Sequence, residues 1–413
     1  MYRQRYPDDP GMHNSHTDTY TSVSYRHNLG FCERVKQSLV AIVVGVILLV
    51  VASGLLFWNE GRAVQTAKSL DEGLSKLVPL HTTDVAFENN NGHLVFLQGA
   101  LHTDQAVSDP VYKLSVSAAK LRRTVEMYQW VEHESKRETN EGDQTREETD
   151  YSYSLEWRQE VVNSGSFYST VGHENPGSMP ASSETLTAKR IQVGAFYLSE
   201  GLINQIDDFQ EVAPTSGITP GDASLQYHGG YYFQSSNPSN PQVGDIRIKF
   251  EAAGLLKTSQ IGPPTEVSIV ARQQGSHLEA YQTEAGDDLE ILHTELLSGK
   301  EVFAKAHNRN TFMTWGIRFG GWFLMFIAFG CLTSIVTTLV DWIPVVRELV
   351  AMGMGALNAA FSISLSLTII ALGWIRYRPW LGISILVMSV TPFLFTKLRS
   401  LFWSPSSSRH RHV

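Results

Sequence analysis

The hydrophobic positions of this 413-residue chain are gathered into four stretches without any charged side chain. They cover residues 39–58, 319–340, 349–375 and 380–396. A helix that crosses the hydrocarbon core of a bilayer needs roughly 20 mostly apolar residues. We therefore predict four transmembrane helices, one near the N-terminus and three near the C-terminus.

The long segment between the first two stretches, residues 59–313, has the alternating pattern of β-strands. Residues 124–131 and 151–157 are rich in β-branched and aromatic side chains, and the highly charged residues 132–150 lie between them. This pattern predicts a long hairpin with a solvated tip. Further strands are predicted at residues 94–98, 191–197, 231–234, 245–250 and 267–272. The predicted fold class is an α+β multi-pass membrane protein with a large β-rich domain.

Helix signals are fewer in this segment. Residues 63–77 are expected to continue the first apolar stretch as a helix, and Ser199 is a candidate N-cap for a short helix over residues 199–206. Ser298 and Glu301 have the spacing of a capping box. A helix that starts there would run without a break into the second apolar stretch.

The charge distribution predicts the topology. Residues 59–313 hold 35 acidic and 20 basic side chains, whereas the rest of the chain holds 6 acidic and 13 basic ones. Positively charged flanks stay on the cytoplasmic face. We therefore expect a luminal domain at 59–313. The expected cytoplasmic segments are an N-terminal tail at 1–38, a loop at 341–348 and a C-terminal tail at 397–413.

Signals for chemistry are weak. With two cysteines a disulfide scaffold is excluded, and the apolar stretches exclude an ordinary soluble enzyme or a nucleic-acid binder. The pairs His173-Glu174, Asp207-Asp208 and Asp287-Asp288 are more typical of solvated loops than of a metal site or a hydrolase. We therefore predict no enzyme activity, no cofactor and no metal. Cys32, just before the first span, is a candidate for palmitoylation, with an unmodified thiol as the alternative.

Small and polar side chains form a pattern in the last spans. Asn358, Ser362 and Ser366 follow each other at i, i+4 and i+8, on the helix face that also carries Gly355. Ser364 begins a second polar edge, and Gly316 and Gly320 have the spacing of a close-packing motif. These seven residues are candidates for helix packing and oligomerisation, although a polar stripe could instead line a pore.

Several longer runs resemble the LUMA family, the transmembrane-protein-forty-three group of nuclear-envelope and endoplasmic-reticulum proteins. The runs that carry the resemblance include Asn59-Glu-Gly-Arg62, Lys120-Leu-Arg-Arg-x-Val-Glu-Met-Tyr-Gln-Trp-Val-Glu132, Thr314-Trp-Gly316 and Val340-Asp-Trp342. They cover most of residues 58–400 and leave the two ends of the chain outside.

The resemblance implies a non-enzymatic scaffold of the inner nuclear membrane and the endoplasmic reticulum that self-associates and binds emerin and lamins. An oligomeric channel or channel-associated subunit is the alternative, and a luminal enzyme is a third hypothesis. Whether the luminal domain binds a lipid or another ligand stays open at this point.

Overall fold

The computed structural model describes residues 19–27, 30–141, 144–222, 224–340, 344–375, 379–380 and 382–388. It divides into two compact units. The first is formed by Met1–Asn28, Gly73–Gln282 and Asp288–Val302, and holds the strands. The second is formed by Leu29–Glu72, Thr283–Asp287 and Phe303–Val413, and holds the long helices.

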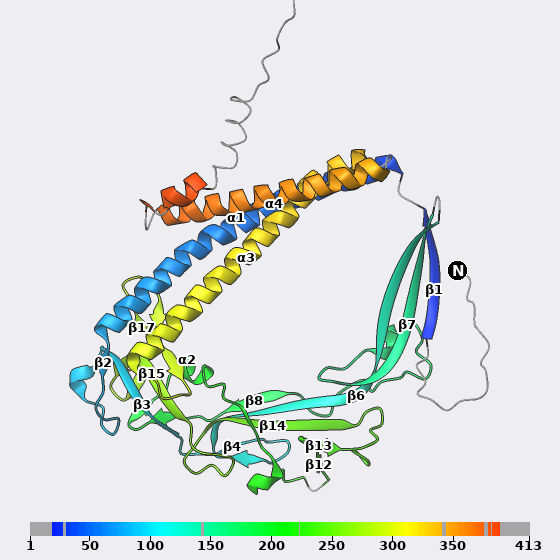
Figure 1. The fold of residues 1–413 in the computed structure, drawn as a ribbon. Coiled ribbons are helices and arrows are strands. Elements are labelled where there is room, and N and C mark those ends of the chain that lie inside the picture. Colours follow the sequence, from blue (N-terminus) through cyan, green and yellow to red (C-terminus); the bar gives the residue numbers. More distant parts are fainter. Residues whose placement is uncertain are drawn as a thin grey trace, which may run out of the picture. The chain divides into compact units, whose positions relative to one another are not determined.

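The larger sheet of the first unit has eight strands (Figure 1). Six of them follow one another across the sheet in the order β1 (Thr19–His27), β7 (Gln144–Arg158), β6 (Ala118–Glu141), β14 (Ile246–Leu255), β13 (Tyr231–Gln234) and β12 (Gln226–His228). Two short strands pair outside this path, β8 (Glu184–Thr187) with β6 and β11 (Gln210–Glu211) with β14.

The second sheet has seven strands, and five of them close on themselves. Its order is β19 (Ile291–His293), β15 (Glu266–Gln274), β16 (His277–Glu279), β10 (Phe196–Tyr197), β9 (Gln192–Val193), β3 (Leu94–His102) and β2 (Val78–Pro79). Because β15 also pairs with β3, the circuit of β15, β16, β10, β9 and β3 is closed.

Shorter elements complete this unit. They are the strand pairs β4 (Val107–Ser108) with β5 (Ser115–Val116) and β17 (Tyr281–Gln282) with β18 (Asp288–Leu289), the helix α2 (Glu200–Asn204), and 3₁₀ turns at Glu88–Asn90, Ser164–Ser166 and Pro214–Ser216. As predicted, the Ser199 hydroxyl caps α2 by accepting a hydrogen bond from the Leu202 amide at 3.1 Å.

Both sheets contribute to one hydrophobic core. Leu121 of β6 and Ile248 of β14 belong to the same buried cluster as Leu97 of β3 and Ile269 of β15. Each fully buried side chain of this kind stabilises the fold by roughly 1.5–3 kcal/mol. The strands predicted at 94–98, 231–234, 245–250 and 267–272 are confirmed. The strand predicted at 191–197 is two strands, because Gly194 with φ 59° turns the chain between β9 and β10.

The predicted hairpin is confirmed and is longer than expected. Strands β6 and β7 pair continuously from Met127↔Arg158 to Glu141↔Gln144. The charged residues predicted as a loop tip at 132–150 are therefore mostly strand. From His133 onward β6 is exposed to solvent, so this part of the strand needs no apolar side chains.

Part of the predicted N-terminal tail is also strand. Strand β1 pairs antiparallel with β7 over nine residues, from Thr19↔Ser152 to His27↔Gln144. An open sheet cannot cross the hydrocarbon of a bilayer, because its edge strands would leave backbone groups without hydrogen bonds. Two strands paired in such a sheet therefore lie on the same side of the membrane. The charge distribution predicts opposite sides for residues 1–38 and 59–313, so the pairing and the predicted topology disagree for the N-terminal tail.

Three helices of the second unit are long and apolar enough to cross a membrane. They are α1 (Phe31–Lys76), α3 (Gly299–Leu339) and α4 (Pro344–Ile375). They cover the first three predicted spans except for Val340, which follows the end of α3, and α4 begins inside the segment predicted as the loop 341–348. The fourth predicted span at 380–396 lies largely outside the described residues, so a count of four stays a prediction.

Helices α1 and α3 pack closely along the apolar part of α1. Near its start, the Ser38 hydroxyl lies 2.7 Å from that of Thr338, close to the end of α3. Gly45 has no room for a side chain, since a Cβ there would lie 2.8 Å from the Ala328 carbonyl oxygen. Ala52, Leu56 and Met325 form the buried centre of the helix packing.

Candidate functional site

A buried polar network lies where the apolar stretches of the second unit begin and end. Asn59 and Glu60 directly follow the apolar stretch of α1, and Arg318 directly precedes that of α3. Trp374 lies at the end of α4. These positions put charged and polar side chains of all three helices at one level.

Glu60 is the centre of this network. Its carboxylate accepts two hydrogen bonds from Arg318, Nε to Oε1 at 2.7 Å and Nη2 to Oε2 at 2.6 Å. The indole Nε1 of Trp374 donates a third, also at 2.6 Å, to Oε2. The side chain of Glu60 is fully buried and that of Arg318 is 15% exposed. A carboxylate so enclosed is tolerated because it is paired and hydrogen-bonded.

The backbone of α4 approaches Glu60 too closely for any other residue than glycine at position 373. A Cβ on Gly373 would lie 2.8 Å from the Glu60 Cβ. The glycine thus lets the neighbouring Trp374 reach the carboxylate.

A second layer of hydrogen bonds joins α1 and α3 one turn further along. Arg62 donates to the Asn310 Oδ1 at 3.0 Å, to the Thr314 hydroxyl at 3.0 Å and to the Asn59 Oδ1 at 3.2 Å. Asn310 in turn donates to the Ala63 carbonyl oxygen at 3.0 Å. Asn59 donates to the Thr314 carbonyl oxygen at 3.2 Å. Each helix therefore supplies both donors and acceptors to the other.

This network was not predicted, because none of its charged residues lies inside one of the apolar stretches. The available signal lay at their borders. An acidic residue that follows one span and an arginine that precedes the next span lie on the same side of the membrane and at the same depth.

The predicted polar stripe of α4 is buried within the helix packing. The exposed fractions of Asn358, Ser362 and Ser366 are 6%, 0% and 4%. The Asn358 amide donates to the Thr333 hydroxyl of α3 at 2.9 Å, whereas the two serine hydroxyls donate to carbonyl oxygens of their own helix. Gly355 and Ser364 are half-buried. A role of these residues in association between copies stays a prediction.

The other predicted residues lie apart from this packing. Gly316 and Gly320 are exposed, and no atom lies within 4 Å of a Cβ built on either of them. The close approach instead uses the next residue, Gly321, where a Cβ would lie 2.5 Å from Leu56. Cys32 is exposed and Cys331 is half-buried, and both thiols are free. Palmitoylation of Cys32 stays a prediction.

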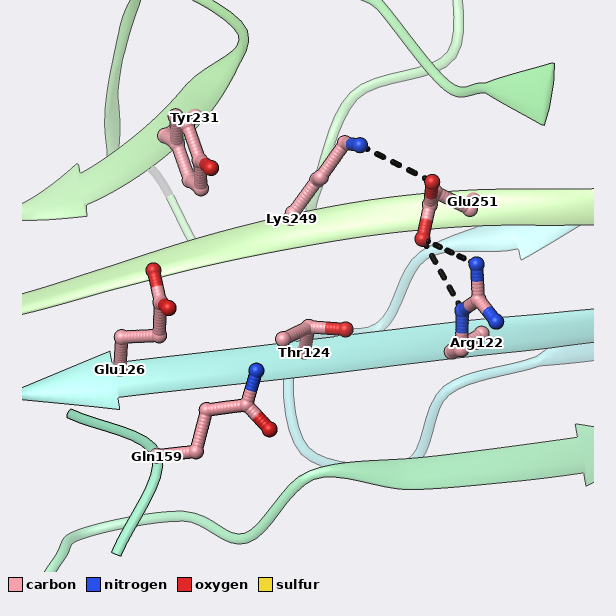
Figure 2. A pocket seen from close by; sticks show the side chains of 7 residues that line it. All are labelled: Arg122, Thr124, Glu126, Gln159, Tyr231, Lys249 and Glu251. Carbon is pink, nitrogen blue, oxygen red and sulfur yellow. Dashed lines mark hydrogen bonds and ion pairs between the residues drawn. The ribbon is translucent and has the colours of Figure 1, made fainter. Parts of the chain in front are cut away.

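The β-rich unit has a charged hollow of about 400 Å³ on the outer face of its larger sheet (Figure 2). Arg122 donates two hydrogen bonds to Glu251, at 2.9 and 2.7 Å, and Lys249 donates a third at 2.9 Å. Burial raises the pKa of Glu251, but the hydrogen bonds from Lys249 and Arg122 outweigh it and hold that pKa below its usual range. Glu251 is therefore ionised and fully paired, which is the state of a structural carboxylate rather than of a general acid.

The opposite end of the hollow is closed in the same way. Glu126 accepts a hydrogen bond from Arg247 at 2.6 Å, and the Arg247 guanidinium lies 4.2 Å from the ring centre of Tyr231 and 4.7 Å from that of Trp157. The charges of this hollow thus neutralise one another and hold β6, β13 and β14 together.

Two of the acidic and histidine candidates, Asp208 and His173, stabilise the fold of the β-rich unit. Asp208 accepts hydrogen bonds from the Gly254 amide and the Thr265 hydroxyl, at 3.0 and 2.8 Å. The prediction of a solvated loop is wrong for His173, which is 2% exposed because its ring stacks on Tyr153 with 3.9 Å between ring centres. Within the ranges that the structure describes, no three His, Cys, Asp or Glu side chains are close enough to hold a metal ion.

The sequence of this chain is similar to that of one family of membrane proteins. The sequence model of the family "Transmembrane protein 43" matches residues 127–379. Transmembrane protein 43 of Mus musculus is 41% identical over 371 residues, which is 90% of this chain and 92% of the relative. The Homo sapiens protein of that name is 40% identical over the same shares. The Drosophila melanogaster homolog is 33% identical over 85% of this chain and 92% of its own length. No solved structure matches the chain.

Proposed function

Because this chain belongs to the Transmembrane protein 43 family, we propose that it is a non-enzymatic membrane scaffold of the nuclear envelope. In this role it organises protein complexes at the inner nuclear membrane and helps to maintain the structure of the envelope. The observation that carries the proposal is the ion pair between Glu60 and Arg318, because these buried charges join helix α1 to helix α3. A scaffold needs a rigid membrane part, and a buried pair of this kind supplies it.

The polar stripe of α4 supports a scaffold over the alternative of an oligomeric channel or channel-associated subunit. A pore-lining stripe must face water. Asn358, Ser362 and Ser366 are at most 6% exposed in a single chain, and the Asn358 amide donates a hydrogen bond to Thr333 of α3. This arrangement favours packing.

The partners and the location follow from the family resemblance. We propose emerin, lamins and further copies of this chain as partners, and the inner nuclear membrane and the endoplasmic reticulum as the location. The charge distribution supports a luminal domain at 59–313 and a cytoplasmic or nucleoplasmic tail at 397–413. For the N-terminal tail, the positive charges support the cytoplasmic face, whereas the β1–β7 pairing supports the luminal face.

The scaffold is tested by proximity labelling in cells, with the labelling enzyme fused once to the C-terminus and once within the luminal domain. Wild type is compared with Arg318→Leu, which leaves Glu60 buried without its ion pair, and with Arg309→Leu. Arg309 lies on the same helix but is exposed, so it controls for the loss of one arginine. We expect Arg318→Leu to lose partners that Arg309→Leu retains.

Two results would contradict the proposal. One is an unchanged partner set for Arg318→Leu despite correct membrane insertion. The other is a current across planar bilayers from the purified wild-type protein whose conductance changes in Asn358→Leu, since that outcome would establish the channel instead.

A further inference from the structure

A second hollow in the β-rich unit has a different character from the charge-paired one. It has a volume of about 440 Å³, within the range of roughly 300–1,000 Å³ that is usual for small-molecule sites. Its lining combines the cations Lys189 and Arg190 with the aromatic pair Tyr197 and His277. Apolar side chains, among them Ile191 and Ile203, line the rest.

The backbone fixes this lining from three elements. The Leu198 amide donates to the Ile191 carbonyl oxygen at 2.9 Å, and so holds the two basic residues beside the start of α2. Strands β10 and β16 pair in parallel at Tyr197↔His277, and their rings stack with 5.3 Å between centres. The aromatic wall of the hollow therefore belongs to the seven-stranded sheet, and the two cations lie at the edge of the hollow.

The two cations have no partner within the described ranges. Neither Lys189 nor Arg190 forms an ion pair or a side-chain hydrogen bond there. By contrast, Arg122, Arg123, Arg247 and Arg272 of the same unit each bind a carboxylate. Residues 59–313 hold 35 acidic against 20 basic side chains, so two adjacent cations without a partner make a local exception to an acidic surface.

From this geometry we propose that the hollow binds a phosphate group. Arginine and lysine together offer several N–H donors to the oxygens of a phosphate, and the His277 ring and the Tyr197 hydroxyl can add further donors. The apolar side chains next to the cations fit the carbon chain of a phosphate-bearing amphiphile. A lipid headgroup and a free phosphate offer the same phosphate oxygens to these donors. The experiment is therefore designed to distinguish the two ligands.

The experiment uses the full-length protein in a non-ionic detergent and titration calorimetry. The probes are inorganic phosphate, dihexanoyl phosphatidic acid and the zwitterionic dihexanoyl phosphatidylcholine, which has the same two chains. We expect saturable binding of phosphate or phosphatidic acid that is at least tenfold weaker in Lys189→Ala/Arg190→Ala. Tighter binding of phosphatidic acid than of phosphate identifies a lipid headgroup, and equal binding identifies free phosphate.

The chain offers a matched control in Lys136→Ala/Arg137→Ala. This variant removes the same two residue types from adjacent positions on the exposed part of β6, and so changes the net charge equally. It should bind the probes within twofold of wild type. Equal weakening in both variants, or no binding of either phosphate probe to the wild type, would overturn the proposal. Because Lys189 and Arg190 are exposed, both variants should melt at the wild-type temperature.

Discussion

Arg318 binds both carboxylate oxygens of Glu60 through the Nε–Nη2 edge of its guanidinium group, although 258 positions separate the two residues in the sequence. The pair lies at the border of two apolar stretches, and Trp374 completes it from a third helix. Removal of one partner of a buried ion pair costs about 3–5 kcal/mol, because the other charge stays buried. Replacement of both partners costs much less.

The first prediction follows from that asymmetry. Arg318→Leu should lower the free energy of unfolding of the detergent-solubilised protein by about 3–5 kcal/mol. The double variant Glu60→Gln/Arg318→Leu should recover a large part of the loss. Chemical denaturation followed by tryptophan fluorescence measures both, with Arg309→Leu as the control. If Arg318→Leu and the double variant lose the same stability, the ion pair does not hold the helices together.

A second prediction concerns the space beside Glu60. Gly373→Ala adds a Cβ 2.8 Å from the Glu60 Cβ, so the helix must shift, at a cost of about 1–3 kcal/mol. The matched control is Gly353→Ala on the same helix, where no atom lies within 4 Å of the new Cβ. That change should be neutral or stabilise the helix by up to about 1 kcal/mol. Equal thermal shifts of the two variants would show that α4 does not pack tightly against Glu60.

A third prediction compares two serines of α4. Ser366 is 4% exposed, whereas Ser364 is only half-buried. Leucine is favourable in lipid, so both Ser→Leu variants should insert normally. Ser366→Leu adds bulk at a buried position and should weaken association between copies, or with partners, more than Ser364→Leu does. Crosslinking in membranes measures the oligomer ladder. Identical ladders for wild type and both variants would refute a packing role for this face.

A fourth prediction concerns alkaline pH. Burial raises the pKa of Tyr232 from 10.0 to about 12, and its hydroxyl has no hydrogen-bond partner in the described part of the chain. Because the pKa of Tyr232 is raised in the folded state, its protonated side chain contributes fully to the free energy of unfolding below pH 10. This contribution is lost as the pH rises towards 12. The loss amounts to about 3 kcal/mol.

Tyr232→Phe removes both the titration and the unsatisfied hydroxyl. It should match or exceed wild-type stability at pH 7, and lose less stability between pH 10 and 12. Melting temperatures across this range measure the effect, and Tyr25→Phe, at an exposed tyrosine, is the control. An identical alkaline loss in wild type and Tyr232→Phe would assign it to other groups.

A fifth prediction decides the position of the N-terminal tail. The contact between Ser38 and Thr338 places the start of α1 beside the end of α3, and the positive charges of the tail agree with that placement. We therefore expect the β1–β7 pairing to be given up when α1 inserts into a membrane. Protease added to sealed microsomes should remove residues 1–38 and the tail after Thr396, and spare 59–313. An N-terminal epitope that survives would instead place the tail beside β7.

The sequence pattern predicted those elements whose burial alternates. Residues 124–131 show the period of two because one face of β6 contacts the core, and Ser298 and Glu301 form the predicted capping box, with the Ser298 amide 2.7 Å from the Glu301 carboxylate. The pattern could not show that 132–150 is mostly strand, because β6 is exposed to solvent from His133 onward and such a stretch needs no alternation. It also could not predict β1, whose polar residues are strand only through their pairing with β7.

The site was hidden for a related reason. Hydropathy detects the interior of a span, whereas Asn59, Glu60 and Arg318 lie at the borders of spans. Whether these side chains bind one another depends on the depth at which two helices, distant in the sequence, meet. The phosphate hollow depends likewise on a turn at Gly194 and on a parallel pairing at His277 that no local pattern contains.

Helix α3 continues from its cap at Ser298 into the apolar stretch as one uninterrupted helix of 41 residues without a proline. At a rise of about 1.5 Å per residue, it is a rod about 60 Å long. A helix in a bilayer responds to a change in membrane thickness by tilting. Because the rod has no proline hinge to absorb the angle, tilt of its apolar half must swing its capped end through an arc. We therefore expect a change in bilayer thickness to move the Ser298 end of α3, outside the apolar stretch.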